Sequence, residues 1–123
     1  MRRKIPFLIV FVACLTSCDG SPDKGSNACI YSNENNLHSC FQLTAGSKMD
    51  FLSACKKILI LNRLKDKKMA MGAADACPAE PSSTCKYVLE NTADLNMYNL
   101  SSEEAIERQR RVCEMMKGIY IAH

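Results

Sequence analysis

The chain has 123 residues, with 16 Lys and Arg against 13 Asp and Glu, eight Cys, four Tyr, four Phe and no Trp. Three of the basic residues, Arg2, Arg3 and Lys4, stand at the start, so the chain from residue 18 onward is formally neutral. A neutral chain without Trp lacks the basic surface and the stacking side chains typical of nucleic-acid binders. We therefore expect no nucleic-acid partner.

The first 18 residues carry a targeting pattern. A short cationic stretch, residues 1–4, precedes nine apolar residues, 5–13. Nine residues fall far short of the roughly 20 that cross a bilayer as a helix, but they suit the apolar region of a secretory signal. The segment Leu15-Thr16-Ser17-Cys18 that follows resembles the lipobox of bacterial lipoproteins.

This resemblance implies a signal peptide over residues 1–17 and an acylated Cys18 that anchors the chain to a membrane of the bacterial envelope, facing the periplasm. Several acyl chains on one residue hold a protein firmly at its membrane. Asp19, which follows the acylated Cys in this pattern, favours the inner membrane. The alternative is an ordinary signal peptide in which Cys18 is incidental.

Beyond the signal, the composition separates a linker from a domain. Residues 18–28 are rich in Gly, Ser and Pro and show no apolar periodicity, so they are predicted to form a flexible tether that begins with the lipidated Cys. Residues 29–123 form one predicted domain, in which the sequence shows no internal repeat. A chain of this length can bury a modest core, which disulfides would reinforce.

The cysteines indicate such disulfides. With Cys14 in the signal and Cys18 acylated, an even number remains in an oxidising compartment, which predicts three bridges. Sequence alone permits 15 pairings, and we favour Cys77–Cys85 because the Pro-containing turn between them can bring neighbouring segments together. No metal site is expected, because there is no C-x-x-C motif and there are only two His. The six predicted disulfide cysteines are Cys29, Cys40, Cys55, Cys77, Cys85 and Cys113.

Apolar periodicity predicts a mostly helical domain. Helices are expected over residues 33–43, from Ser47 to about Lys68, over 69–76 as a continuation or a second short piece, over 82–90, and from Ser101 to about 120. In the second of these, Ile60, Leu61 and Leu64 widen the apolar face, so we expect that helix to be buried on much of its circumference. Few Val, Ile or Thr alternations compete for strands. The predicted fold is all-α, a small disulfide-stapled bundle of three to five helices.

Catalysis finds little support in the sequence, so neither an enzyme nor a cofactor is expected. There is no G-x-S-x-G, no H-E-x-x-H and no glycine-rich phosphate loop. Glu103, Glu104 and Glu107 are clustered, but acidic residues in a first helical turn commonly interact with the helix dipole and solvent. His38 lies in a polar stretch and is expected at the surface.

The charges are segregated along the chain. Residues 48–68 hold seven Lys and Arg against two Asp, whereas residues 75–107 hold seven Asp and Glu against one Lys. One interpretation is that oppositely charged helices pack beside each other. Another is a basic patch that attracts a charged protein partner or rests on anionic lipid headgroups. The residues of this predicted partner patch are Lys56, Lys57, Arg63, Lys65, Lys67 and Lys68.

Three functions fit a small anchored domain of this kind. The first is a protein-binding module that neutralises an incoming effector, as an immunity or exclusion factor does. The second is an inhibitor of a cell-wall hydrolase, because residues 94–98, Arg108-Gln109-Arg110 and Cys113 resemble segments of helical lysozyme-inhibitor lipoproteins, without the Trp usual there; no site is carried over from this likeness. The third is a structural accessory of an envelope or secretion complex.

Overall fold

The structure, a computed structural model, describes residues 27–123. The predicted signal peptide, the lipidation site Cys18 and nearly all of the tether lie outside these residues. The described elements are, in chain order, β2 (Ala28–Asn33), β3 (Asn36–Leu43), α3 (Lys48–Lys65), β4 (Met69–Ala74), β5 (Ser83–Tyr87), α4 (Val88–Asn91), β6 (Ala93–Met97), α5 (Glu103–Met115) and β7 (Ile119–Ala122).

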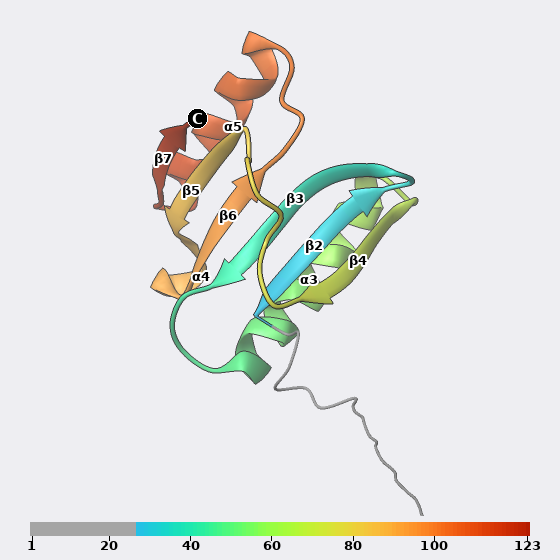
Figure 1. The fold of residues 1–123 in the computed structure, drawn as a ribbon, viewed down its shortest axis with the longest axis vertical. Coiled ribbons are helices and arrows are strands. Elements are labelled where there is room, and N and C mark those ends of the chain that lie inside the picture. The colour runs from blue at the N-terminus through green and yellow to red at the C-terminus, as the bar shows by residue number, and fades with distance from the viewer. Residues whose placement is uncertain (1–26) are drawn as a thin grey trace, which may run out of the picture.

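The strands form one antiparallel sheet in the order β4-β2-β3-β6-β5-β7 (Figure 1). The sheet consists of two units with the same topology, β2–β3–α3–β4 and β5–β6–α5–β7. In each unit, two antiparallel strands are followed by a helix and by a third strand that pairs with the first. The units join where β3 pairs with β6, so the sheet repeats a motif that the sequence does not reveal.

Both helices cover the same face of the sheet. A row of paired residues crosses the sheet with side chains on one face, because directly paired residues share a face. Cys29 and Cys85 lie in this row and are disulfide-bonded to α3 and α5 respectively. Figure 1 shows the two helices on that side, behind the strands. The row comprises Ala73, Cys29, Phe41, Leu95, Cys85 and Tyr120.

The main core lies between this face and the helices. Phe41 and Leu95 fill its centre, and Tyr31 packs edge-on against Phe41 with ring centroids 6.1 Å apart. The buried Tyr31 hydroxyl donates a hydrogen bond to the Cys55 carbonyl at 2.6 Å, which ties β2 to α3. At the other end, the backbone of Gly118 passes so close to Cys85 that a Cβ there would lie 2.4 Å from its sulfur. Gly is thus required at this approach.

The opposite face of the sheet is partly covered by the connection between the two units. Residues 75–82, which we call the strap, leave β4 at one edge and cross in front of β3 to reach β5 (Figure 1). A second, smaller cluster of buried residues, Ala28, Cys40 and Tyr98, packs with Cys77 of the strap. We call this side of the sheet the open face, since no helix covers it.

The predicted all-α bundle of three to five helices is wrong: the fold is α+β, with a six-stranded antiparallel sheet. The helices predicted near residues 47–68 and from 101 exist as α3 and α5. Their N-caps are Ser47 and Ser102, whose hydroxyls accept hydrogen bonds from the backbone N–H of Asp50 and Ala105. The other predicted helical regions consist mainly of the strands β3, β4 and β5.

Specific local features explain these errors. Residues 33–43 form a hairpin turn and β3, because Asn33 pairs with Asn36 and Glu34 takes φ 56° in the turn. The helix expected to reach residue 120 ends at Met115, since Lys117 takes φ 61°. The predicted helix over 82–90 is β5 followed by the short α4, in which Leu89 and Glu90 have left-handed backbone angles.

Candidate interaction surfaces

Three disulfides fix the framework. They join Cys29 to Cys55, Cys40 to Cys77, and Cys85 to Cys113, so all six cysteines predicted to be oxidised are paired. Cys55 on α3 and Cys113 on α5 each bond to the first strand of their own unit. The bridges therefore hold each helix on its sheet, and the third holds the strap.

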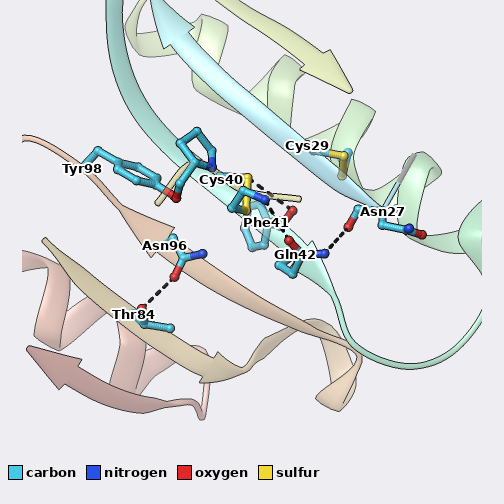
Figure 2. Close-up of a disulfide and its surroundings, with 11 residues drawn as sticks. Asn27, Cys29, Cys40, Phe41, Gln42, Thr84, Asn96 and Tyr98 are labelled. Atoms are coloured by element: carbon cyan, nitrogen blue, oxygen red, sulfur yellow. Dashed lines mark hydrogen bonds between the residues drawn. A yellow bond between two sulfur atoms is a disulfide. The ribbon is translucent and has the colours of Figure 1, made fainter. Parts of the chain in front are cut away.

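The favoured pairing of Cys77 with Cys85 is wrong, and strand geometry explains why. Side chains alternate between the faces of a sheet, so Cys85 points to the helices whereas Cys40 points to the open face. Cys77 lies on the strap over the open face and reaches Cys40 (Figure 2). The strap is also held by the Tyr98 hydroxyl, which donates to the Pro78 carbonyl at 2.6 Å, and by the Gln42 side chain, which accepts from Cys77 N–H at 2.8 Å.

The side of α3 that faces away from the sheet, which we call the α3 outer face, is the first exposed apolar surface. Phe51 and Cys55 are buried against the sheet. Burial over much of the circumference is wrong, however, because the apolar residues on the far side are exposed. Their exposed fractions are Met49 80%, Ile60 64%, Leu61 62% and Leu64 78%.

The predicted basic patch belongs to α3 and the turn that follows it. Two of its six residues have partners in the fold: Arg63 Nε donates to the Met69 carbonyl at 2.9 Å, and Lys68 forms an ion pair of 2.7 Å with Glu34. The other four residues are exposed, and no ion pair involves them within residues 27–123. These residues are Lys56, Lys57, Lys65 and Lys67.

The charges of α5 are arranged differently. Arg110 is paired with Glu107 and Glu114, and the other two arginines of the helix pair with Glu104 and Glu107, so all three arginines of α5 are paired within the helix. The hydrogen bond from Arg110 lowers the pKa of the Glu107 carboxyl, and that carboxyl in turn raises the pKa of Arg110. Two of the three clustered glutamates thus act as ion-pair partners within the helix. The described ion pairs do not join α3 to α5, so the charges of Lys56, Lys57 and Lys65 on α3 are available to another molecule.

The second exposed surface lies on the open face beyond the strap, and we call it the β5–β7 face. Ile121 pairs with Thr84 and Ile119 with Lys86, so these four side chains share the open face. Ile119 is 57% exposed and Ile121 37%. Thr84 donates a hydrogen bond to the Asn96 side chain at 2.7 Å (Figure 2). Its hydroxyl also lies 2.8 Å from the His123 ring. Two exposed isoleucines therefore lie beside a hydrogen-bonded polar group.

A hollow of about 400 Å³ lies where the ends of β3 and β6 meet α5. His38 lines it, and partial burial of the ring lowers its pKa, although the charge of Asp66 acts in the opposite direction. His38 was expected at the surface, and the residue as a whole is exposed, although its ring is partly buried. Met97, Tyr98, Arg108 and Gln109 line the same hollow. The segments that resemble lysozyme inhibitors are therefore neighbours in the fold.

Sequence reasoning missed the β5–β7 face, because Ile119 was assigned to the helix predicted to reach residue 120.

Within residues 27–123, no helix has the length and apolar character needed to cross a bilayer. No protein-family model, curated protein or solved structure matches this chain.

Proposed function

We propose that this chain is a lipid-anchored protein of the bacterial envelope that binds and neutralises an incoming effector protein, as an immunity or exclusion factor does. The partner docks on the β5–β7 face. The observation that carries this proposal is the exposure of Ile119 and Ile121 on a sheet face that the strap leaves uncovered. The anchor at Cys18 keeps the domain at the membrane that the effector must pass.

The chemistry of the β5–β7 face suits a protein partner. The solvent face of an antiparallel sheet is ordinarily polar, so two neighbouring isoleucines exposed on it favour contact with another surface. Lys86, Thr84 and Asn96 border them on the inner side of the sheet, so apolar and polar groups adjoin as they do in protein interfaces. The disulfide between Cys85 and Cys113 fixes the strand beneath. Binding to a preorganised surface costs little conformational entropy.

Competition between strains tests the proposal. A strain lacking the gene should become sensitive to a neighbour that delivers the effector, and the wild-type gene should restore protection. The Ile119→Ser/Ile121→Ser variant should fail to restore it, although it is exported and keeps three disulfides. Met115→Ser changes an apolar side chain on α5 that is even more exposed, and should protect like the wild type. Unchanged survival of the deletion strain against effector-producing neighbours would refute neutralisation.

The anchor has its own test. Mass spectrometry of the mature protein should find an acylated N-terminal cysteine, with residues 1–17 removed. Cys18→Ser should abolish acylation and release the domain from the membrane fraction. An unmodified Cys18 in the mature chain would contradict the lipoprotein assignment without bearing on the β5–β7 face.

Inhibition of a cell-wall hydrolase is the second candidate, and the hollow beside His38 favours it. The lysozyme-inhibitor-like segments contribute Met97, Tyr98, Arg108 and Gln109 to its lining. The purified domain should then slow muramidases at a stoichiometric ratio, and Arg108→Ala should weaken the inhibition. No effect on several muramidases would remove this candidate.

A further inference from the structure

The α3 outer face combines apolar and basic side chains on one side of the helix. At 100° per residue, Ile60, Leu61 and Leu64 fall within an arc of about 100°, opposite the buried Cys55. Lys57 lies inside this arc, and Lys56 and Lys65 flank it. Asp50 and Ser53 also fall within the arc, but they lie in the first turns of the helix, away from the apolar residues near its end. All three lysines are exposed, and Asp50 is the single acidic residue of the helix.

This arrangement is typical of helices that lie in the surface of a membrane. Such helices place Leu, Ile and Met among the acyl chains, while flanking lysines extend their amines to the phosphates. A helix that packs on one side and contacts only water on the other would expose polar residues there. Leu64, at 78% exposure, lies at the centre of the outer face instead.

The short distance along the chain between α3 and the proposed anchor at Cys18 indicates that the surface facing α3 is the membrane. Eight residues, 19–26, separate Cys18 from Asn27, which allows a reach of about 30 Å. Asn27 accepts a hydrogen bond from Leu43 N–H, five residues before α3 begins. The helix itself is about 27 Å long. The anchor can therefore bring the whole of α3 against the membrane that holds it.

Charge decides between the alternative occupants. A second copy of the chain would bring two sets of exposed lysines together, and like charges repel across an interface. An anionic bilayer offers opposite charge to Lys56, Lys57, Lys65 and Lys67 together with an apolar interior for Ile60, Leu61 and Leu64.

We propose that the α3 outer face lies on an anionic lipid surface and acts as a second attachment beside the acylated Cys18. The contact fixes the orientation of the domain. The β5–β7 face, on the other side of the sheet, then remains accessible to a partner. The inference rests on the proposed function for one point, the acylated anchor at Cys18. The contact between α3 and lipid can be measured separately, in a chain that lacks the acyl group.

The test uses the chain from residue 18 onward with Cys18→Ser, which keeps every described element and lacks acyl chains. It should sediment with vesicles that contain phosphatidylglycerol, and much less with pure phosphatidylcholine vesicles. Added salt should weaken this binding. Ile60→Ser/Leu64→Ser should reduce binding by at least about tenfold, since two apolar side chains no longer enter the bilayer. Lys56→Gln/Lys57→Gln should remove the preference for anionic lipid.

Ile119→Ser is the matched control, because Ile119 is exposed to a similar extent but lies on the open face. It should bind vesicles like the unsubstituted chain. Equal binding to anionic and neutral vesicles, or an equal loss for Ile119→Ser and for Ile60→Ser/Leu64→Ser, would overturn the proposal. Loss of effector protection in the α3 variant without any loss of vesicle binding would also overturn it, in favour of an acidic protein partner. Failure of the anchor would appear as an unmodified Cys18, and failure of the proposed function as unchanged strain survival.

Discussion

Removal of the bridge that holds the strap should destabilise the domain mainly through its unfolded state. In the Cys40→Ala/Cys77→Ala variant, the two hydrogen bonds of the strap should remain. The Tyr98 hydroxyl bonds to the Pro78 carbonyl, and the Gln42 side chain bonds to the backbone N–H of residue 77, which alanine also has. The native structure should therefore persist. The lost bridge spans 37 residues, and loop-closure entropy for such a length is worth about 4 kcal/mol.

Urea denaturation followed by far-UV circular dichroism measures this loss, under conditions in which the remaining disulfides are neither reduced nor exchanged. The free energy of unfolding should fall by about 3–4 kcal/mol, and the m-value should rise because the unfolded chain exposes more surface. Cys85→Ala/Cys113→Ala is the comparison: it spans 28 residues, but both cysteines are buried, so loss of packing adds to a similar entropic term. A loss below about 1 kcal/mol for the strap variant, with an unchanged m-value, would refute the unfolded-state argument.

Two further substitutions test the packing between sheet and helices. Gly118→Ala should lower the free energy of unfolding by at least about 2 kcal/mol, because the added Cβ meets the Cys85 sulfur at 2.4 Å and the Lys86 carbonyl at 2.8 Å, whereas Gly72→Ala, with no atom within 4 Å, should be nearly neutral. Equal thermal melting of the two variants would contradict the close approach. Tyr31→Phe should cost about 1 kcal/mol at neutral pH through the lost hydrogen bond to Cys55. Burial raises the pKa of Tyr31 above its ordinary value of 10.0, so the unfolded state ionises first, and wild-type stability should fall by up to about 1.4 kcal/mol per pH unit above pH 10. Denaturation between pH 9 and 11 should show a shallower decline for Tyr31→Phe, and parallel curves would contradict this assignment.

The sequence predicted the two main helices but no strand. Ser47 and Ser102 cap helices at or within one residue of the expected positions, because capping and apolar periodicity are local signals. The strands lack the β-branched alternation that usually identifies them: β4 reads MAMGAA and β3 reads NLHSCFQL. Pairing with neighbouring strands stabilises both, and β3 is also held by the disulfide from Cys40 to the strap; such non-local contacts cannot be read from propensity.

The surfaces were predicted unevenly for a similar reason. The basic character of residues 48–68 is a local property, and the structure places those side chains on α3 and its following turn. Whether Ile60, Leu61 and Leu64 are buried depends on how many elements pack around α3, which periodicity does not report. A single sheet covers one side of the helix, so the other side stays exposed. The β5–β7 face could not be predicted without knowing that the chain turns at Lys117 and continues as the edge strand β7.

The strap has a consequence for assembly. The two units are joined by strand pairing between β3 and β6 and by the core that they share. If β5 to β7 of one chain completed the sheet of another chain, the result would be domain swapping. Such an exchange requires residues 75–82 to leave the face they cross. The covalent link from Cys77 to Cys40 prevents this movement. Oxidation of Cys40 and Cys77 thus favours pairing of each chain's first unit with its own second unit over exchange between chains.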